Sequence, residues 1–181
     1  ITMSGAVTLN NDLNIIDSKK LGPETYVDLI DYIVMNSYHP LAGISTGEIF
    51  YEIFTKEMQH IIDVGEKIIQ TRDLKNLYIQ KNCVSVCVPI KEDSPFDKKL
   101  RKKYSKVLQI VRSGEYFFDV LDKEATKGRA LKRIMDLLNL KKDEVAVFGD
   151  SYNDLSMFEE AGLRIAVKNS YNEILDKADI I

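Results

Sequence analysis

The chain lacks the sequence features of membrane-spanning, secreted and nucleotide-binding proteins. No apolar run approaches the roughly 20 residues that a helix needs to cross a bilayer, and no charged start is followed by an apolar core and a cleavage site. Neither a P-loop nor a dinucleotide-binding fingerprint occurs, and the spacing of a calcium EF-hand loop is absent. The remaining composition, 45% hydrophobic and 29% charged over 181 residues, indicates a globular protein of one or two domains without a membrane partner.

Basic residues and cysteines are also few or scattered. The formal net charge is −3, and we interpret the densest basic stretch, residues 98–104, as the solvated face of a helix, so no nucleic-acid partner is expected. Cys83 and Cys87 are predicted to lie on one face of a strand, where their spacing prevents a disulfide. Two reduced, buried thiols indicate a cytoplasmic location.

The first two thirds of the chain predict an α+β region with a largely antiparallel sheet. Two β-prone runs flank a turn at residues 10–12, and Pro23 occupies the favoured first position of a helix. The expected apolar stripe of that helix consists of Leu29, Ile30, Ile33 and Val34. Further strands are expected at 41–45, 76–80, 83–90, 106–113 and 115–122, and further helices at 60–70 and 96–104.

From residue 126 the pattern changes to an alternation of helices and apolar strands. The first predicted helix has one apolar face, formed by Ala130, Leu131, Ile134, Leu137 and Leu138. Strands are then expected at 145–150, 164–167 and 179–181, and helices at 153–161 and 171–178. Such alternation is typical of a parallel α/β sheet covered on both faces.

Two carboxylates and an amide lie close together after the strand at 145–150. Asp150 ends this strand, and Asn153 and Asp154 open the following helix. Ligands bind at the carboxyl ends of parallel strands, and neighbouring carboxylates repel each other unless a cation lies between them. Mg²⁺ suits such oxygen ligands, and Gly149 would let the backbone approach a ligand closely. The alternative is structural: Asn153 as a helix cap and Asp150 as a turn residue.

Two further residues could belong to the same site. Lys127 begins the predicted helix, where its charge opposes the macrodipole but could neutralise a phosphate. An ordinary exposed lysine is the alternative. Asn169 follows the next strand at the same edge of the sheet, either supporting the site or forming a turn. Ser170 and Glu173 have the spacing of a capping box.

Three segments together resemble the last part of a Cof-type phosphatase of the haloacid dehalogenase (HAD) superfamily: Lys127-Gly128, residues 149–154 and residues 168–170. The strongest resemblance covers residues 119–181, and a weaker one covers the whole chain. It implies an α/β fold: part of a HAD-like, Rossmann-type parallel core at 117–181, an inserted α+β cap that selects the substrate at 6–116, and a linker at 1–5. P-type ATPases share the motif, but this chain has no predicted membrane span.

The resemblance also implies a function. Small phosphomonoesters such as sugar phosphates would be hydrolysed with Mg²⁺ through an aspartyl-phosphate intermediate. Asp150 would bind Mg²⁺, and Asp154 would support the metal or hold Lys127. Lys127 would bridge the phosphate and the nucleophile, and Asn153 would contact the phosphate. Gly149 and Asn169 would support the site.

Two departures from the family pattern stand out. Ser4-Gly5 replaces the usual Asn-Gly at the start of the cap, and no D-x-D motif, which would supply the nucleophile and the acid/base, occurs in the chain. We therefore expect an internal fragment that is inactive alone. A non-catalytic binding or regulatory module and a sugar phosphomutase are the alternative functions. Residues 45–48 and Asn82 are candidates for substrate selection in the cap.

Overall fold

The larger part of the molecule is built on a six-stranded sheet. The computed structural model describes residues 1–91, 94–114 and 116–181. The strands follow the spatial order β5-β4-β3-β6-β8-β7, and all neighbours are antiparallel except β4 and β5. Their bounds are Leu41–Ile44 (β3), Ile49–Tyr51 (β4), Ile68–Gln70 (β5), Cys83–Pro89 (β6), Leu108–Gly114 (β7) and Phe117–Asp122 (β8). The largely antiparallel sheet predicted for this region is confirmed.

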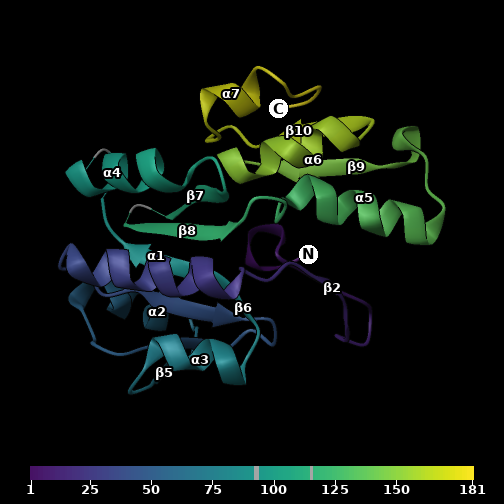
Figure 1. The fold of residues 1–181 in the computed structure, drawn as a ribbon. Coiled ribbons are helices and arrows are strands. Elements are labelled where there is room, and N and C mark those ends of the chain that lie inside the picture. The colour runs from purple at the N-terminus through teal and green to yellow at the C-terminus, as the bar shows by residue number, and fades with distance from the viewer. Residues whose placement is uncertain (92–93, 115) are drawn as a thin grey trace.

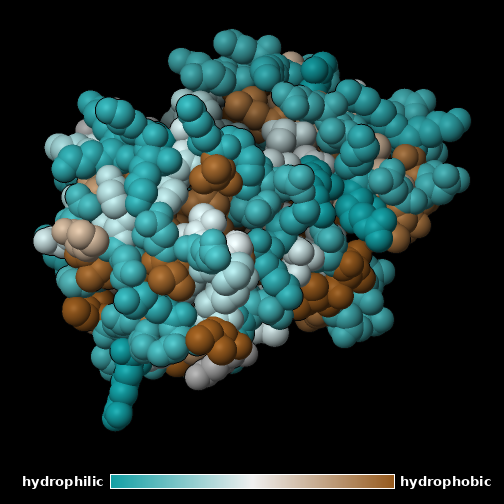
Figure 2. Space-filling view, in the orientation of Figure 1, coloured by the Kyte–Doolittle hydropathy of each residue, from teal (hydrophilic) through white to brown (hydrophobic). Residues whose placement is uncertain are grey.

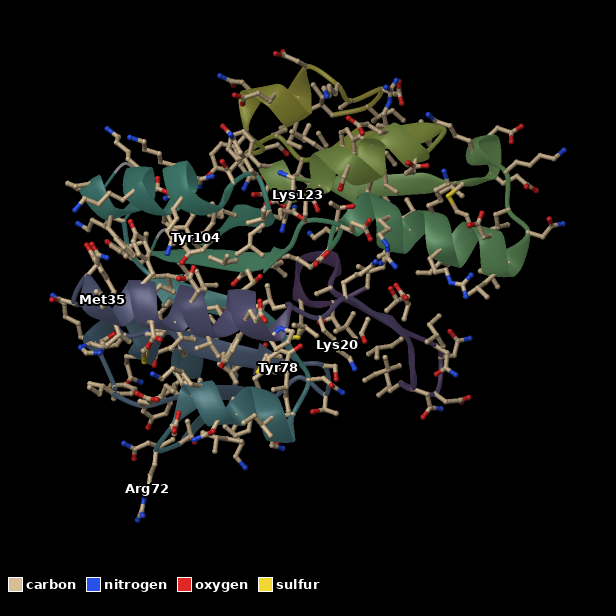
Figure 3. All side chains as sticks on the ribbon, in the orientation of Figure 1. Lys20, Met35, Arg72, Tyr78, Tyr104 and Lys123 are labelled. Carbon is tan, nitrogen blue, oxygen red and sulfur yellow. The ribbon has the colours of Figure 1, made fainter. Side chains whose placement is uncertain are left out.

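Three helices cover one face of this sheet (Figure 1): α1 (Pro23–Met35), α3 (Leu74–Gln80) and α4 (Pro95–Tyr104). Their apolar side chains form one buried cluster with those of the strands. Tyr104, labelled between α4 and α1 in Figure 3, donates a hydrogen bond of 2.7 Å to the carboxylate of Asp28 in α1. The short helix α2 (Gln59–Asp63), which follows the 3-10 turn Lys56–Met58, lies on the opposite face.

Three local predictions in this region are wrong. Residues 76–80 belong to a helix rather than a strand, because Asp73 caps its N-terminus by accepting a hydrogen bond of 3.1 Å from the backbone of Asn76. The helix expected at 60–70 is confined to α2, and residues 68–70 form a strand paired with β4. Val34 is 48% exposed, so the buried stripe of α1 is narrower than expected.

The two cysteines do not share a face of β6. The pairing of β3 with β6 shifts register between Gly43 and Ile44, as at a β-bulge. Consequently the thiol of Cys83 contacts Tyr26 in α1, whereas the thiol of Cys87 contacts Asp119 of β8. Both cysteines are free.

The C-terminal part contains a parallel pair of strands, β9 (Ala146–Gly149) and β10 (Leu163–Ala166). The helices are α5 (Lys127–Leu138), α6 (Leu155–Glu160) and α7 (Asn172–Leu175), with 3-10 turns at Lys142–Glu144 and Tyr152–Asp154 (η4). The predicted parallel α/β pattern is confirmed. The strand expected at 179–181 is reduced to a single bridge between Ile165 and Ile180.

The expected double cover of the parallel strands is not present among the described residues. Val147 is buried, but Phe148, which points to the other side of β9, is 69% exposed. Leu137 and Leu138, predicted to lie on the buried face of α5, are 52% and 63% exposed. Phe148 therefore stays largely exposed, whereas Leu137 and Leu138 line a shallow pocket together with Leu9 and Ile16 of the N-terminal hairpin.

The N-terminal segment forms the predicted hairpin and contacts both parts of the molecule. It comprises a 3-10 turn (η1, Met3–Gly5) and the antiparallel strands β1 (Val7–Leu9) and β2 (Ile15–Ser18). In Figure 1 its first residues lie between the end of β8 and the start of α5. The predicted domain boundary after residue 116 falls between β7 and β8, although β8 pairs with both β6 and β7 in the sheet.

The surface in Figure 2 is mostly hydrophilic, with hydrophobic side chains in several separate groups. Within the described ranges, no helix is long and apolar enough to cross a membrane.

Candidate active site

The two acidic residues of the candidate site follow β9, at the edge of the parallel pair where this strand ends. Asp150 follows β9 directly and is exposed, whereas Asp154 in η4 is only 3% exposed. A Cβ atom on Gly149 would lie 2.7 Å from Cβ of Asp154 and 2.9 Å from the ring of Phe158. Only glycine at position 149 allows Asp154 to pack this closely against the end of the strand.

Asp154 uses both of its carboxylate oxygens within the protein. Oδ1 accepts a hydrogen bond of 2.5 Å from Nζ of Lys127, and Oδ2 accepts bonds of 3.0 and 3.2 Å from the backbone N–H groups of Asp150 and Ser151. Burial alone would raise the pKa of Asp154, but these hydrogen bonds outweigh it and lower the pKa below its ordinary value. Asp154 is therefore a charged anchor for Lys127 and for the loop after β9.

Lys127 is positioned by the contact between α5 and α6. Thr126 caps α5 by accepting a hydrogen bond of 3.0 Å from the backbone of Arg129, and the N–H of Gly128 donates to Oγ of Ser156 at 2.9 Å. A Cβ atom on Gly128 would lie 2.1 Å from the carbonyl oxygen of Ser156, so the two helices meet backbone to backbone. The side chain of Lys127 remains 27% exposed, which leaves its ammonium group accessible to a ligand.

Asn153 carries a polar atom that the described residues leave unsatisfied. Its Oδ1 is buried and has no hydrogen-bond partner among them. Leaving a buried acceptor without a partner costs about 1–3 kcal/mol. A bound cation or a hydrogen-bond donor from a ligand would remove this cost.

The loop after β10 closes the edge beside Asp150. Oγ of the buried Ser170 donates to the carbonyl oxygens of Val167 and Gly149 at 2.6 and 3.3 Å, and the backbone N–H of Tyr171 donates to the carbonyl of Asp150 at 3.2 Å. The capping box expected between Ser170 and Glu173 is wrong, because α7 begins after Tyr171 without a side-chain cap. Asn169 is exposed in this loop.

These residues fit part of a magnesium site. The exposed carboxylate of Asp150 and the unsatisfied Oδ1 of Asn153 are hard oxygen ligands of the kind that Mg²⁺ prefers. Asp154 is less suited to direct binding, because Lys127 and two backbone groups occupy its oxygens. No cluster of three His, Cys, Asp or Glu residues that could hold a metal is found within the described ranges. Further ligands would have to be water, phosphate or groups that this chain does not supply.

Three contributors to this geometry were not predicted from the sequence. Ser151 and Ser156 act through a backbone N–H and a hydroxyl, and such local contacts have no distinctive sequence signal. Gly5 has a φ of +99°, and a Cβ there would lie 2.4 Å from the backbone N of Lys127. The sequence drew attention to Gly5 only through its position in the Ser4-Gly5 pair.

Comparison with known proteins assigns this chain to a family, because the model of the haloacid dehalogenase-like hydrolases matches residues 1–181. The chain belongs to the haloacid dehalogenase-like hydrolases. A protein of Haemophilus influenzae named "Putative phosphatase" is 29% identical over 191 residues, which cover 100% of this chain and 69% of the relative. The predictions of a hydrolase of this superfamily and of its fold class are confirmed.

Solved structures of the superfamily share the fold. The structure of TM0651 from Thermotoga maritima has a TM-score of 0.82 at 27% identity and covers 98% of this chain and 67% of its own. The subclass IIB sugar phosphatase BT4131 has a TM-score of 0.83 at 21% identity, with coverage of 99% and 68%. The haloacid dehalogenase-like chain thus spans about two thirds of the length of these proteins.

Proposed function

We propose that the protein containing this chain hydrolyses small phosphomonoesters, such as sugar phosphates, with Mg²⁺ and through an aspartyl-phosphate intermediate. The observation that carries the proposal is the Lys127–Asp154 ion pair beside the exposed carboxylate of Asp150. Phosphoryl transfer depends on positioned cations that stabilise charge on the transferring oxygens. The structural likeness to BT4131, which is a sugar phosphatase, supports the substrate class.

Each residue of the site has a defined task in this proposal. Lys127 binds the phosphoryl oxygens, and Asp154 holds its ammonium group in place. Asn153 contacts the phosphate or the metal, while Asp150 ligates Mg²⁺. When bound, Mg²⁺ would supply positive charge that polarises the phosphoryl group. Gly149 and Asn169 shape the edge at which these groups meet.

The attacking aspartate and the acid/base lie outside these 181 residues in this proposal, because no D-x-D motif occurs in them. Residues 1–181 alone should therefore be inactive. The six-stranded sheet and its helices would form the cap, with β8 included up to Asp122, residues 1–5 would be the linker, and the C-terminal part would belong to the core. The partner is a small phosphorylated metabolite, and the free Cys83 and Cys87 support a cytoplasmic location.

The decisive experiment compares variants of the complete gene product with p-nitrophenyl phosphate as the substrate. Lys127→Ala should lower kcat by about 10²–10³-fold, as expected when one donor to a transition-state oxygen is removed. Lys132→Ala, which removes an exposed charge from the same helix, is the matched control and should retain activity. Equal activity of both variants would exclude the proposed role of Lys127.

Metal binding is measured separately from turnover. Calorimetric titration with Mg²⁺ should show weaker binding to Asp150→Ala than to the unmodified protein. Complete absence of turnover with a broad panel of phosphomonoesters would favour the non-catalytic binding module. Isomerised sugar phosphate instead of free phosphate as the product would identify a phosphomutase.

A further inference from the structure

A cavity of about 530 Å³ lies on the face of the sheet opposite α1. Its walls come from the sheet, from α2 with the loop after it, and from the first residues of the chain. Gly43 forms part of its floor, since a Cβ there would lie 2.4 Å from both Cε of Met3 and Oγ of Ser85. The volume is within the range of small-molecule sites, about 300–1,000 Å³.

The cavity adjoins the candidate active site through three consecutive residues. Met3 lines the cavity, whereas Gly5 packs against the backbone of Thr126 and Lys127. Two residues of chain span at most about 7 Å. The start of α5, which carries Lys127, therefore lies close to the wall of the cavity, and in the proposed function the organic part of an ester bound at Lys127 extends toward it.

The chemistry of the lining is acidic and neutral. Asp119 and Glu66 contribute carboxylates, Ser85 and Thr2 contribute hydroxyl groups, and His60 contributes an imidazole. No lysine or arginine is among the lining residues in the described part of the chain. Asp119 is held at the wall between two elements, since its carboxylate accepts a hydrogen bond of 3.3 Å from Ser4 and another from the thiol of Cys87.

We propose that Asp119 determines substrate specificity by favouring phosphate esters of neutral, hydroxyl-rich alcohols over esters whose organic part carries a carboxylate. This inference rests on the proposed phosphatase function. Hydroxyl groups of a sugar or polyol donate hydrogen bonds to the carboxylate of Asp119. A carboxylate in the same place meets like charge without a cation in the lining, and like-charge juxtaposition disfavours binding strongly.

A matched pair of substrates tests this charge discrimination. Sorbitol 6-phosphate and 6-phosphogluconate have the same carbon chain and differ at one end, where a CH₂OH group replaces a carboxylate. In the complete gene product, kcat/KM should favour sorbitol 6-phosphate by about tenfold or more, the size expected for one unscreened like-charge contact near a protein surface. Asp119→Asn should reduce this preference about tenfold, mainly by improving the reaction of 6-phosphogluconate.

Controls separate a charge effect in the cavity from a general one. Asp63→Asn makes the same charge change at an exposed position of α2 that does not line the cavity, and it should leave the preference unchanged. Glu66→Gln removes the second, exposed carboxylate of the lining and should shift the preference in the same direction by about twofold. If Asp119→Asn fails to fold, the preference of the unmodified protein remains the test.

The failures of the two proposals are distinguishable. Hydrolysis of neither ester nor of p-nitrophenyl phosphate would reject the phosphatase function itself. Hydrolysis with equal or reversed preference in the unmodified protein, or an unchanged preference in Asp119→Asn, would reject the role of Asp119 alone.

Discussion

The six-stranded sheet region and the C-terminal parallel region differ in how their structures are held together. The sheet region has a continuous hydrophobic core that spans three helices and most of its strands. The C-terminal region has a smaller cluster around Val147, Phe158 and Ile174, and Phe148 is exposed on the far side of β9. Its active-site geometry depends instead on close glycine contacts and the Lys127–Asp154 pair. Precision of the candidate site therefore arises from local backbone contacts more than from a deep core.

The largest loss of stability is expected when the glycine at the contact between α5 and α6 is replaced. Gly128→Ala should lower the free energy of unfolding by about 3 kcal/mol, because overpacking against the rigid carbonyl of Ser156 forces the helices apart. Gly22→Ala in the sheet region meets only Oγ of Thr25, at an ordinary 3.6 Å, and should cost less than about 1 kcal/mol. Urea unfolding measures both, and similar losses would contradict the proposed importance of the glycine contacts.

The carboxylate charge that anchors Lys127 can be removed without changing the size of the side chain at position 154. Asp154→Asn should destabilise the protein by about 1–2 kcal/mol at neutral pH, since Lys127 loses its charged partner while staying partly solvated. The native pKa of Asp154 is lowered, so the unfolded state binds more protons between the native and unfolded pKa values. Its stabilising contribution is therefore complete above its ordinary unfolded pKa of about 3.9 and declines as pH falls through the native value.

Urea unfolding at a series of pH values measures this dependence. The difference between the unmodified protein and Asp154→Asn should shrink in acid. Asp28→Asn in the sheet region is the matched comparison, because hydrogen bonds from Tyr104 and Lys103 lower the pKa of Asp28 at a more exposed position. A difference for Asp154→Asn that does not depend on pH would show that the carboxylate charge contributes little.

The smallest expected effect concerns the exposed face of β9. Phe148→Ser should change the stability of residues 1–181 by no more than about 0.5 kcal/mol, because the ring is 69% exposed. The same substitution is then measured by urea unfolding in the complete gene product. A much larger loss there would show that residues outside the described part bury this face of the C-terminal region.

Strong local signals predicted much of the fold. The Pro23 helix, the hairpin around residues 10–12 and the parallel pair β9–β10 were all predicted, because proline position, turn residues and apolar runs act over a few neighbours. Residues 76–80 were predicted wrongly, since the cap from Asp73 outweighs their β propensity. The faces of Cys83 and Cys87 depend on a register shift, which cross-strand pairing alone decides.

The candidate site, too, was predicted in part from local sequence and decided in part by tertiary packing. Asp150, Asn153, Asp154 and Lys127 could be named from the sequence, because strand ends and helix starts bring polar residues to one edge of a parallel sheet. Which carboxylate pairs with Lys127 and which stays exposed depends on the packing of α5 against α6, and only the tertiary structure decided it. The same holds for Asp119, which has no motif around it. Its place beside Ser4 arises because a strand and the chain's first turn, 115 residues apart, are packed together.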